Sequence, residues 1–412
     1  MSSFRNIGHC EIPNDWADIS LGDEDKRPLL VMRNGLTKTQ SDHDGTFKVS
    51  RIETISNGVI DESRVKYLSE VSREEEDKYL IRKDDMLFSH INSDVHLGKT
   101  AIAKKDYNDL LQGMNLLLFR VNEEILDPEF LFFTMNYYKN IGVFISICSR
   151  AVNQSSINQG KLKALKVPLP PLPEQYNIAH ILSKIQSAIE TQKKIIQTTT
   201  ELKKALMQKL FTEGLKGEPQ KETEIGLVPK SWEVVKLKEI VNFTTGKLNA
   251  NQAKSDGKYP FFTCSQETFW IDSYAFDTEA VLLSGNNARA IYSVKYFNGK
   301  FNAYQRTYVI TIKDTSQFSY TFLKYILSFN LERLRKLSIG TSTKYLTLGI
   351  LENLEILKPK IDEQENIANA LSIVESKIES SQAKLKSLQS LFKSMLHHLM
   401  TGQIRVKDLK VS

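Results

Sequence analysis

Three short groups of residues in the sequence have types that could perform catalytic or metal chemistry, and each group is incomplete. Gly98-Lys99-Thr100 resembles the end of a phosphate-binding loop, but Ser93 stands where that loop needs its first glycine. Glu201-Leu202-Lys203 has a nuclease-like Glu-x-Lys spacing without a preceding Pro-Asp strand. His90 and His96 share a loop but lack a third metal ligand nearby. We therefore expect a chain that is not an enzyme by itself and carries no metal or cofactor.

The composition is typical of an ordinary folded protein. Its 412 residues, 41% hydrophobic and 25% charged, suggest two or three domains. The net charge of +6 is compatible with nucleic-acid binding but does not require it. The three cysteines lie far apart, the N-terminus is polar, and the apolar runs are too short to span a membrane. We expect a cytoplasmic protein without disulfides, signal peptide or membrane span.

The chain contains an internal repeat. Ile12-Pro13-Asn14-Asp15-Trp16 is matched by Val228-Pro229-Lys230-Ser231-Trp232. Glu174-Gln175-Tyr176-Asn177-Ile178-Ala179 is matched by Glu363-Gln364-Glu365-Asn366-Ile367-Ala368, and this match continues without gaps to Thr212 and Thr401. Between the two motifs the copies share little sequence. The repeat predicts two similar frames that carry two different inserts.

Each frame includes a long amphipathic helix. A proline run ends at Pro173, so we expect the first helix to start after it; glycines such as Gly214 and Gly402 follow the two helical patterns. Apolar residues at heptad spacing indicate that each helix packs against another long helix. The predicted seam residues are Ile178, Leu182, Ile185, Ile189, Ile196, Leu206 and Leu210 in the first helix, and Ile367, Leu371, Val374, Ile378, Leu385, Leu388, Phe392, Met395 and Leu399 in the second.

The two helices, each roughly 57 Å long, can bury their apolar stripes against each other as an antiparallel pair within one chain. Homodimerisation through the same seams is the alternative. Gln192, Thr199 and Lys203 interrupt the first stripe and either fix the helix register or face solvent.

The predicted fold class is α+β, with two mixed α/β domains separated by an intramolecular coiled coil and related by a pseudo-twofold repeat. The expected boundaries are 1–165 for the first domain, 166–212 for the first long helix, 213–224 for a linker, 225–357 for the second domain, and 358–412 for the second helix and tail.

The segment Val167-Pro168-Leu169-Pro170-Pro171-Leu172-Pro173 with the following Glu-Gln motif closely resembles the specificity subunit of type I restriction–modification systems. Residues 225–232, 85–99, 283–308 and 399–402 resemble the same family, so the resemblance covers essentially the whole chain. The second copy departs from the pattern, because Lys358-Pro359-Lys360-Ile361-Asp362 replaces the proline run.

The resemblance implies two target recognition domains, each reading one half of a bipartite, asymmetric DNA site. The helices would act as a spacer and as a docking surface for modification subunits, two per chain. The partner subunits would use S-adenosylmethionine for adenine-N6 methylation, and ATP and Mg²⁺ for translocation and cleavage by restriction subunits. The main alternative is a non-catalytic coiled-coil scaffold whose two domains bind proteins. A nuclease fused to its own recognition domain is disfavoured, since the sequence shows no catalytic constellation.

Arg and Lys can read guanine, Asn and Gln adenine, with Ser, Thr and His in support. On this basis the resemblance makes polar loop residues the DNA-binding candidates, although each alone could equally be an ordinary loop residue. In the first domain they are Ser89, His90, Asn92, Ser93, His96, Lys99, Arg150, Asn153, Gln154 and Ser155. In the second they are Asn286, Asn287, Arg289, Gln305, Arg306, Thr341, Ser342, Thr343 and Lys344. The partner-binding candidates, on helix faces opposite the seam, are Gln175, Asn177, Gln364 and Asn366.

Overall fold

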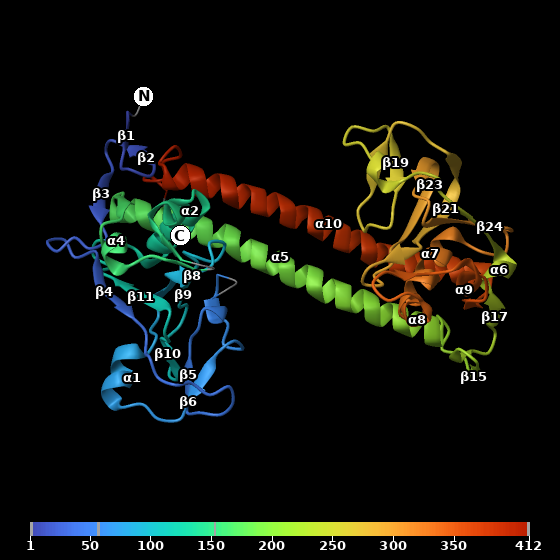
Figure 1. Ribbon diagram of the computed structural model, residues 1–412, viewed down its shortest axis with the longest axis horizontal. Coiled ribbons are helices and arrows are strands. Elements are labelled where there is room, and N and C mark those ends of the chain that lie inside the picture. The colour runs from blue at the N-terminus through green and yellow to red at the C-terminus, as the bar shows by residue number, and fades with distance from the viewer. Residues whose placement is uncertain (1–2, 56–57, 152–153, 410–412) are drawn as a thin grey trace. The chain divides into compact units, whose positions relative to one another are not determined.

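The computed structural model describes residues 3–55, 58–151 and 154–409 (Figure 1). The chain divides into two compact units, the first formed by Met1–Thr191 with Lys384–Ser412 and the second by Gln192–Ala383. Each unit contains one globular domain and one half of each long helix. Among the described residues, no helix is both long enough and apolar enough to cross a membrane.

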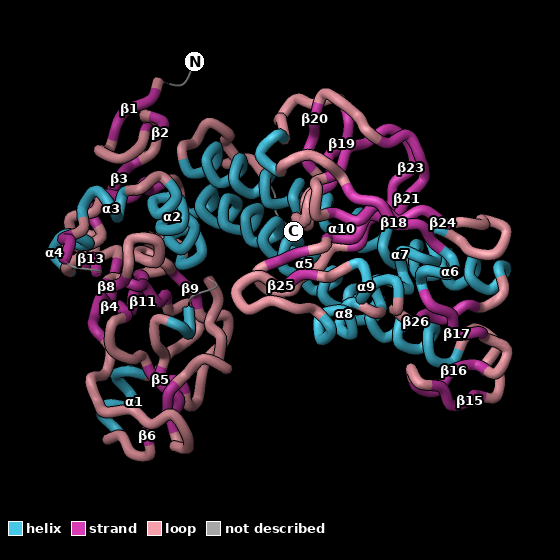
Figure 2. The backbone as a smooth tube through the Cα atoms, turned by 45° about the vertical axis from the view of Figure 1, so that its right-hand side comes forward, coloured by secondary structure: helices cyan, strands magenta, loops and turns pink. Residues whose placement is uncertain are grey.

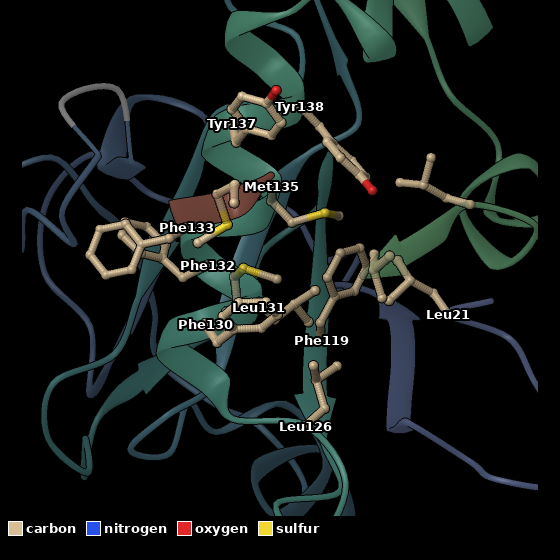
Figure 3. Close-up of a cluster of buried hydrophobic side chains, with 14 of the residues drawn as sticks. Leu21, Phe119, Leu126, Phe130, Leu131, Phe132, Phe133, Met135, Tyr137 and Tyr138 are labelled. Carbon is tan, nitrogen blue, oxygen red and sulfur yellow. The ribbon is translucent and has the colours of Figure 1, made fainter. Parts of the chain in front are cut away.

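A four-stranded antiparallel sheet forms the centre of the first unit. Its strands lie in the order β4 (Leu29–Asn34), β11 (Leu116–Val121), β7 (Met86–Ser89) and β9 (Thr100–Ile102). Helix α2 (Pro128–Asn140) packs against this sheet, and its aromatic side chains share one core with residues of β7 and β11 (Figure 3). The domain is therefore built around a sheet with one helix-covered face.

The remaining elements of the first unit, apart from the long helices, follow in chain order. They are β1 (Phe4–Asn6), β2 (Glu11–Pro13), β3 (Ala17–Ser20), β5 (Phe47–Val49), η1 (Glu53–Ile55), β6 (Lys66–Leu68), α1 (Arg73–Tyr79), β8 (Ile91–Asn92), β10 (Leu110–Leu111), α3 (Val143–Ile147), β12 (Ser149–Ala151), β13 (Gln154–Ser156), α4 (Gln159–Lys163) and β14 (Lys166–Leu169).

The second unit is built around a six-stranded sheet on which α7 (Tyr320–Phe329) packs. Its strands lie in the order β18 (Val241–Thr245), β24 (Thr307–Ile312), β21 (Phe276–Ser284), β23 (Val294–Ala303), β19 (Tyr259–Phe262) and β20 (Phe269–Ile271). The other elements are β15 (Gln220–Thr223), β16 (Gly226–Pro229), β17 (Glu233–Lys236), α6 (Leu237–Ile240), η2 (Ala250–Gln252), β22 (Asn286–Asn287), α8 (Leu331–Leu337), β25 (Lys344–Tyr345), α9 (Leu348–Glu352) and β26 (Glu355–Lys358).

Four strands of the central sheet follow the same order in the two domains. The order β4-β11-β7-β9 corresponds to β18-β24-β21-β23, and β3 pairs with β14 as β17 pairs with β26. The inserts, which share little sequence, thus share a central fold. Strands β19 and β20 extend the sheet in the second domain, whereas the first domain adds a separate sheet of β10, β5 and β6.

The repeated Glu-Gln motif ties each long helix to its domain. Glu174 accepts a hydrogen bond from the Trp16 indole N–H at 3.1 Å, and Glu363 accepts the equivalent bond from Trp232 at 3.2 Å. All four side chains are buried. The match between the two apolar-Pro-x-x-Trp segments and the two Glu-Gln segments therefore has a structural cause: each tryptophan satisfies a buried carboxylate.

The glutamine of the motif connects three segments of its unit. Gln175 accepts a hydrogen bond from the Asp127 backbone N–H at 2.9 Å and donates to the Pro170 carbonyl at 2.9 Å. Gln364 makes the same two bonds, accepting from the Ser319 N–H at 2.9 Å and donating to the Pro359 carbonyl at 2.9 Å. Each glutamine thus joins the N-terminus of the sheet-packed helix to the segment that leads into the long helix.

The long helices are α5 (Leu172–Glu213) and α10 (Ile361–Met400), each of which runs from one unit into the other. In each unit the start of one helix packs against the end of the other, so the pair is antiparallel, as the sequence predicts. Helix α5 begins at Leu172, inside the proline run, because Pro173 is in the first turn, where its missing N–H breaks no helical hydrogen bond. The predicted linker 213–224 also contains structure, since β15 pairs with β16.

Every predicted seam residue is buried or half-buried. The polar interruptions also lie in or beside the seam: Gln192 is 5% exposed, Thr199 is half-buried, and Lys203 is ion-paired with Glu375 at 2.8 Å. Of the two interpretations of these residues, solvent-facing positions are thus excluded for Gln192 and Lys203.

Candidate nucleic-acid interface

In the second domain, strand pairing brings together polar segments that are far apart in the sequence. Strand β22 follows β21 directly and pairs with β25, so that Asn287 lies opposite Lys344. The Gly285 N–H donates to the Arg306 carbonyl at 2.8 Å, which adds the loop between β23 and β24 to the same place. Three of the predicted DNA-binding segments, around residues 286, 306 and 344, therefore form one cluster.

This cluster surrounds a groove of about 190 Å³, which we call the second-domain groove. Its lining residues are Thr245, Gly285, Asn286, Gln305, Arg306, Tyr308, Tyr345 and Leu346. Gln305 and Arg306 are exposed, and Gln305 donates to the Asn249 side chain at 2.9 Å. The groove thus presents a guanidinium, amide groups and a half-exposed phenol, which are hydrogen-bonding groups suited to base edges.

A cysteine that sequence reasoning did not select orients one of these groups. The Cys264 thiol donates to the Asn286 Oδ1 at 2.9 Å and lies 3.3 Å from the Arg306 carbonyl. The thiol thus fixes the direction of the Asn286 amide oxygen at the edge of the groove. Cys264 is distant in sequence from both partners, so nothing in its spacing could have indicated this role.

The loop after β22 is shaped by Asn287 and displays Arg289. The Asn287 Oδ1 accepts hydrogen bonds from the backbone N–H of Arg289 at 2.8 Å and of Ile291 at 3.3 Å. Arg289 itself is exposed, as are Thr341, Ser342 and Thr343, which precede β25. Asn287 therefore has a structural role in its loop, while the other four keep accessible side chains.

In the first domain the equivalent strand pairing occurs. Strand β8 follows β7 and pairs with β13, with Asn92 opposite Ser155 (Figure 2). The Ile157 N–H donates to the His90 carbonyl at 2.9 Å, as the Leu346 N–H donates to the Gly285 carbonyl at 2.8 Å in the second domain. The predicted segments around residues 90 and 154 are thus adjacent, at the place that the second-domain groove occupies in the other copy.

The first-domain candidates divide by burial. Ser89, His90 and Ser155 are 8% exposed or less, and burial lowers the pKa of His90 to about 4. The Asn92 amide is bonded to the Ser89 hydroxyl and to the Ser93 N–H, and the Ser155 hydroxyl donates to Asp94. The side chains of Ser89, Asn92 and Ser155 thus hold the local structure, whereas the Nδ1 of the buried His90 has no hydrogen-bond partner among the described residues.

Other first-domain candidates are accessible. Ser93, His96, Arg150 and Gln154 are exposed, and Lys99 is half-buried. Arg150 lies 3.7 Å from Asp94, a loose surface pair that a phosphate or base could replace. Asn153 lies outside the described residues. The accessible set therefore comes from two segments, the loop after β8 and the β12–β13 hairpin.

Three of the four partner-binding candidates are not on a free surface. Gln175 and Gln364 are at most 1% exposed and fully engaged in the bonds described above. Asn177 is 7% exposed and donates to the carbonyls of Val406 and Leu409. Asn366 is exposed. The heptad pattern could not distinguish the buried candidates from the exposed one. It does not show which faces of a helix are covered by the domains and by the ends of the chain.

Comparison with known proteins identifies the family. Residues 13–201 and 229–390 match the type I restriction modification DNA specificity domain. A Methanocaldococcus jannaschii protein described as a type I restriction enzyme MjaX specificity subunit is 36% identical over 420 residues, 98% of this chain and 97% of its own length. The EcoDI specificity subunit of Escherichia coli is 38% identical over 176 residues, 43% of this chain and 38% of its own.

The fold agrees with a solved structure. The S subunit of a type I restriction–modification system from M. genitalium superimposes with a TM-score of 0.66 at 15% identity, covering 97% of this chain and 98% of that one. The two family matches correspond to the two halves of the repeat. The chain therefore belongs to the type I restriction–modification specificity subunits, with two target recognition domains.

Proposed function

We propose that the paired β22–β25 and β8–β13 segments are the DNA-reading surfaces of the two domains, each reading one half of a bipartite, asymmetric site. The observation that carries this proposal is their equivalence. In the first domain β8, which follows β7, pairs with β13, which precedes α4. In the second domain β22, which follows β21, pairs with β25, which precedes α9. Both pairs display accessible polar side chains. The frames are repeated whereas the exposed side chains differ, as two different half-sites require.

In the second domain, Arg306 and Arg289 are the side chains that we assign to guanine, with Gln305 and Asn286 in support. In the first domain, Arg150, Gln154 and His96 are the equivalent readers. Each bidentate arginine–guanine contact contributes about 1–3 kcal/mol of discrimination. Lys99 and Lys344 are assigned to phosphates, where contacts set affinity but not sequence.

The long helices serve in this proposal as a spacer and as a docking surface for two modification subunits. A continuous helix of 42 residues is about 63 Å long, more than the ~34 Å that separates half-sites one DNA turn apart. We assign S-adenosylmethionine to the modification subunits, and ATP with Mg²⁺ to the restriction subunits. The complete complex would be cytoplasmic.

The test is DNA binding by the complex of this chain with its modification subunit. Arg306→Ala and Arg289→Ala should weaken binding to a duplex with the cognate second half-site by about tenfold or more, and leave duplexes altered in that half-site unaffected. Lys238→Ala, an exposed lysine of α6 away from the groove, is the matched control. An equal loss of affinity for all duplexes would mean that the arginines contact phosphates. A DNA affinity that does not change with salt concentration would favour the alternative, a protein-binding scaffold.

A further inference from the structure

The two units differ at one matched set of positions in and beside the helix seam. In the second unit Glu375 of α10 accepts hydrogen bonds from Lys203 of α5 at 2.8 Å, from the Tyr325 hydroxyl at 2.7 Å, and from Lys324. Tyr325 and Lys324 belong to α7. One carboxylate thus connects both long helices to the recognition domain, and we call these four residues the charged seam cluster.

The charged seam cluster is largely shielded from water. The side chains of Lys203, Lys324 and Glu375 are between 21% and 24% exposed, and Tyr325 is 1% exposed. Burial acts to raise the pKa of Glu375, but the hydrogen bonds from the two lysines and the tyrosine outweigh it and lower the pKa to about 2. The carboxylate is therefore charged at neutral pH and depends on both cations.

The equivalent positions in the first unit carry a different chemistry. The gapless register of the helix repeat places Phe392 at the position of Lys203 and Gln186 at that of Glu375. Helices α2 and α7 are aligned by their capping bonds, from the Phe130 N–H to Asp127 and from the Phe322 N–H to Ser319. This alignment places the adjacent Phe132 and Phe133, both labelled in Figure 3, at the positions of Lys324 and Tyr325.

These first-unit residues form an aromatic cluster. The rings of Phe132 and Phe133 are 5.1 Å apart, and those of Phe133 and Phe392 are 6.2 Å apart. Phe132 and Phe133 are at most 5% exposed, and Phe392 is half-buried. We call Phe132, Phe133, Gln186 and Phe392 the aromatic seam cluster. Each long helix therefore contributes to one cluster of each kind.

We propose that this mismatch makes the helices select partners: α5 accepts α10 and rejects the α5 of a second copy, and α10 likewise rejects another α10. Selection is needed because the repeat gives the two helices similar apolar seams. Otherwise the α5 helices of two chains could pair with each other, and so could their α10 helices. In an α5 pair, the end of each α5 would take the place that the end of α10 occupies in the first unit.

The residues show why each wrong pair is unfavourable. In an antiparallel pair of two α5 helices, the end of one helix would meet the domain at the start of the other, so Lys203 would lie against Phe132, Phe133 and Gln186. The ammonium would lose its bond to Glu375 and would lie against two phenylalanine rings. In a pair of two α10 helices, Phe392 would replace Lys203 beside Glu375, which would keep Lys324 and Tyr325 but lose one of its two cations. A buried charge that loses its partner is strongly destabilising, and such repulsive elements set pairing specificity.

The test converts the charged seam cluster into a copy of the aromatic one. The test variant is the full chain with Lys203→Phe, Lys324→Phe, Tyr325→Phe and Glu375→Gln. Two forms of it with tags of different length are mixed and refolded together at about 100 μM. This concentration is within about tenfold of the millimolar effective concentration of a tethered partner. Native mass spectrometry then counts mixed dimers. We expect the dimer-to-monomer ratio to rise about tenfold or more over that of the unaltered chain, a change that corresponds to ~1.4 kcal/mol per tenfold.

The matched control keeps opposite charges at the same positions. Lys203→Glu, Lys324→Glu and Glu375→Lys together preserve the mismatch with the aromatic seam cluster, so this chain should remain monomeric. If the four-residue variant does not refold, Lys203→Met alone provides the same comparison with a smaller expected rise. A four-residue variant as monomeric as the unaltered chain would overturn the proposal, and so would a control that dimerises equally, because dimerisation would then follow from destabilisation and not from lost selectivity.

Discussion

Replacing Arg405 by alanine should destabilise the first unit and leave the second intact. Arg405 binds Glu174 through Nε and Nη2, each at 2.9 Å, and binds both oxygens of Asp15 through Nη1 at 2.8 Å. The Glu174 side chain is fully buried, while that of Arg405 is 21% exposed. The substitution therefore leaves a buried carboxylate without its cation.

The magnitude follows from the contacts that remain. Removing one member of a buried ion pair costs about 3–5 kcal/mol. Glu174 would keep the Trp16 indole at 3.1 Å and the Val406 N–H at 3.2 Å, so we expect the lower end of that range. A loss of about 3 kcal/mol is a factor of roughly 150 in the local opening equilibrium.

The pH dependence has a definite sign. Burial acts to raise the pKa of Glu174, but hydrogen bonds from Arg405, Val406 and Trp16 outweigh it and lower the pKa below its usual value. A carboxyl with a lowered pKa stabilises the fold above its unfolded pKa and loses this contribution as pH falls. The difference between Arg405→Ala and the unaltered chain should therefore be full at neutral pH and shrink below about pH 4.5, where the unfolded glutamate is protonated.

Hydrogen exchange measured by mass spectrometry reports this locally. Amides at the start of α5 should exchange about 100-fold faster or more in Arg405→Ala. Those at the start of α10, where Glu363 accepts the corresponding indole bond from Trp232, provide the internal control. A change of less than about threefold at α5, or an equal change in both helices, would refute the reasoning.

Three further predictions concern single side chains. Gly98→Ala should lower the free energy of unfolding, measured by chemical denaturation, by roughly 2–4 kcal/mol, because its Cβ would lie 2.2 Å from a Phe144 ring carbon. The control Gly142→Ala has a similar positive φ but open space around the new Cβ, so its loss should be clearly smaller. Cys264→Ala should weaken binding to the second half-site, and Cys264→Ser should restore part of it, because serine keeps a donor for the groove asparagine. Since burial lowers the pKa of His90 to about 4, acidification from about pH 7 to pH 5 should destabilise the unaltered chain more than His90→Phe in denaturant titrations.

The repeat and the long helices were predictable because their signals are local and periodic. The heptad stripe identifies residues that face an apolar partner, and every predicted seam residue is at least half-buried. A start of α5 after the proline run is two residues late, because Pro173 is compatible with a first helical turn. The expected boundary at residue 166 is too early, because Lys166–Leu169 form β14, which pairs with β3. The common fold of the two inserts could not be predicted from the sequence, because the strand order depends on pairing between distant segments and not on shared residues.

The segments that form the proposed reading surfaces were predictable, but their individual side chains were not. Residue types pointed to the segments around residues 90, 154, 286, 306 and 344, which were expected to be loops. Several of them are instead short strands, and their pairing brings the segments of each domain together. Type alone could not show that Ser155 is buried or that Asn287 holds its own loop. Tyr345 and Cys264 were missed because their contribution depends on pairing across the domain.

The central claim is that each domain reads its own half of one DNA site. It is tested most directly by mapping N6-methyladenine in a methylation-free host that expresses this chain with its modification subunit, alongside hosts expressing Arg306→Ala or Arg150→Ala. We predict one split, asymmetric motif, with Arg306→Ala relaxing only one half and Arg150→Ala relaxing only the other. A motif in which either substitution relaxes both halves, or a correctly assembled complex that methylates no motif, would contradict the account.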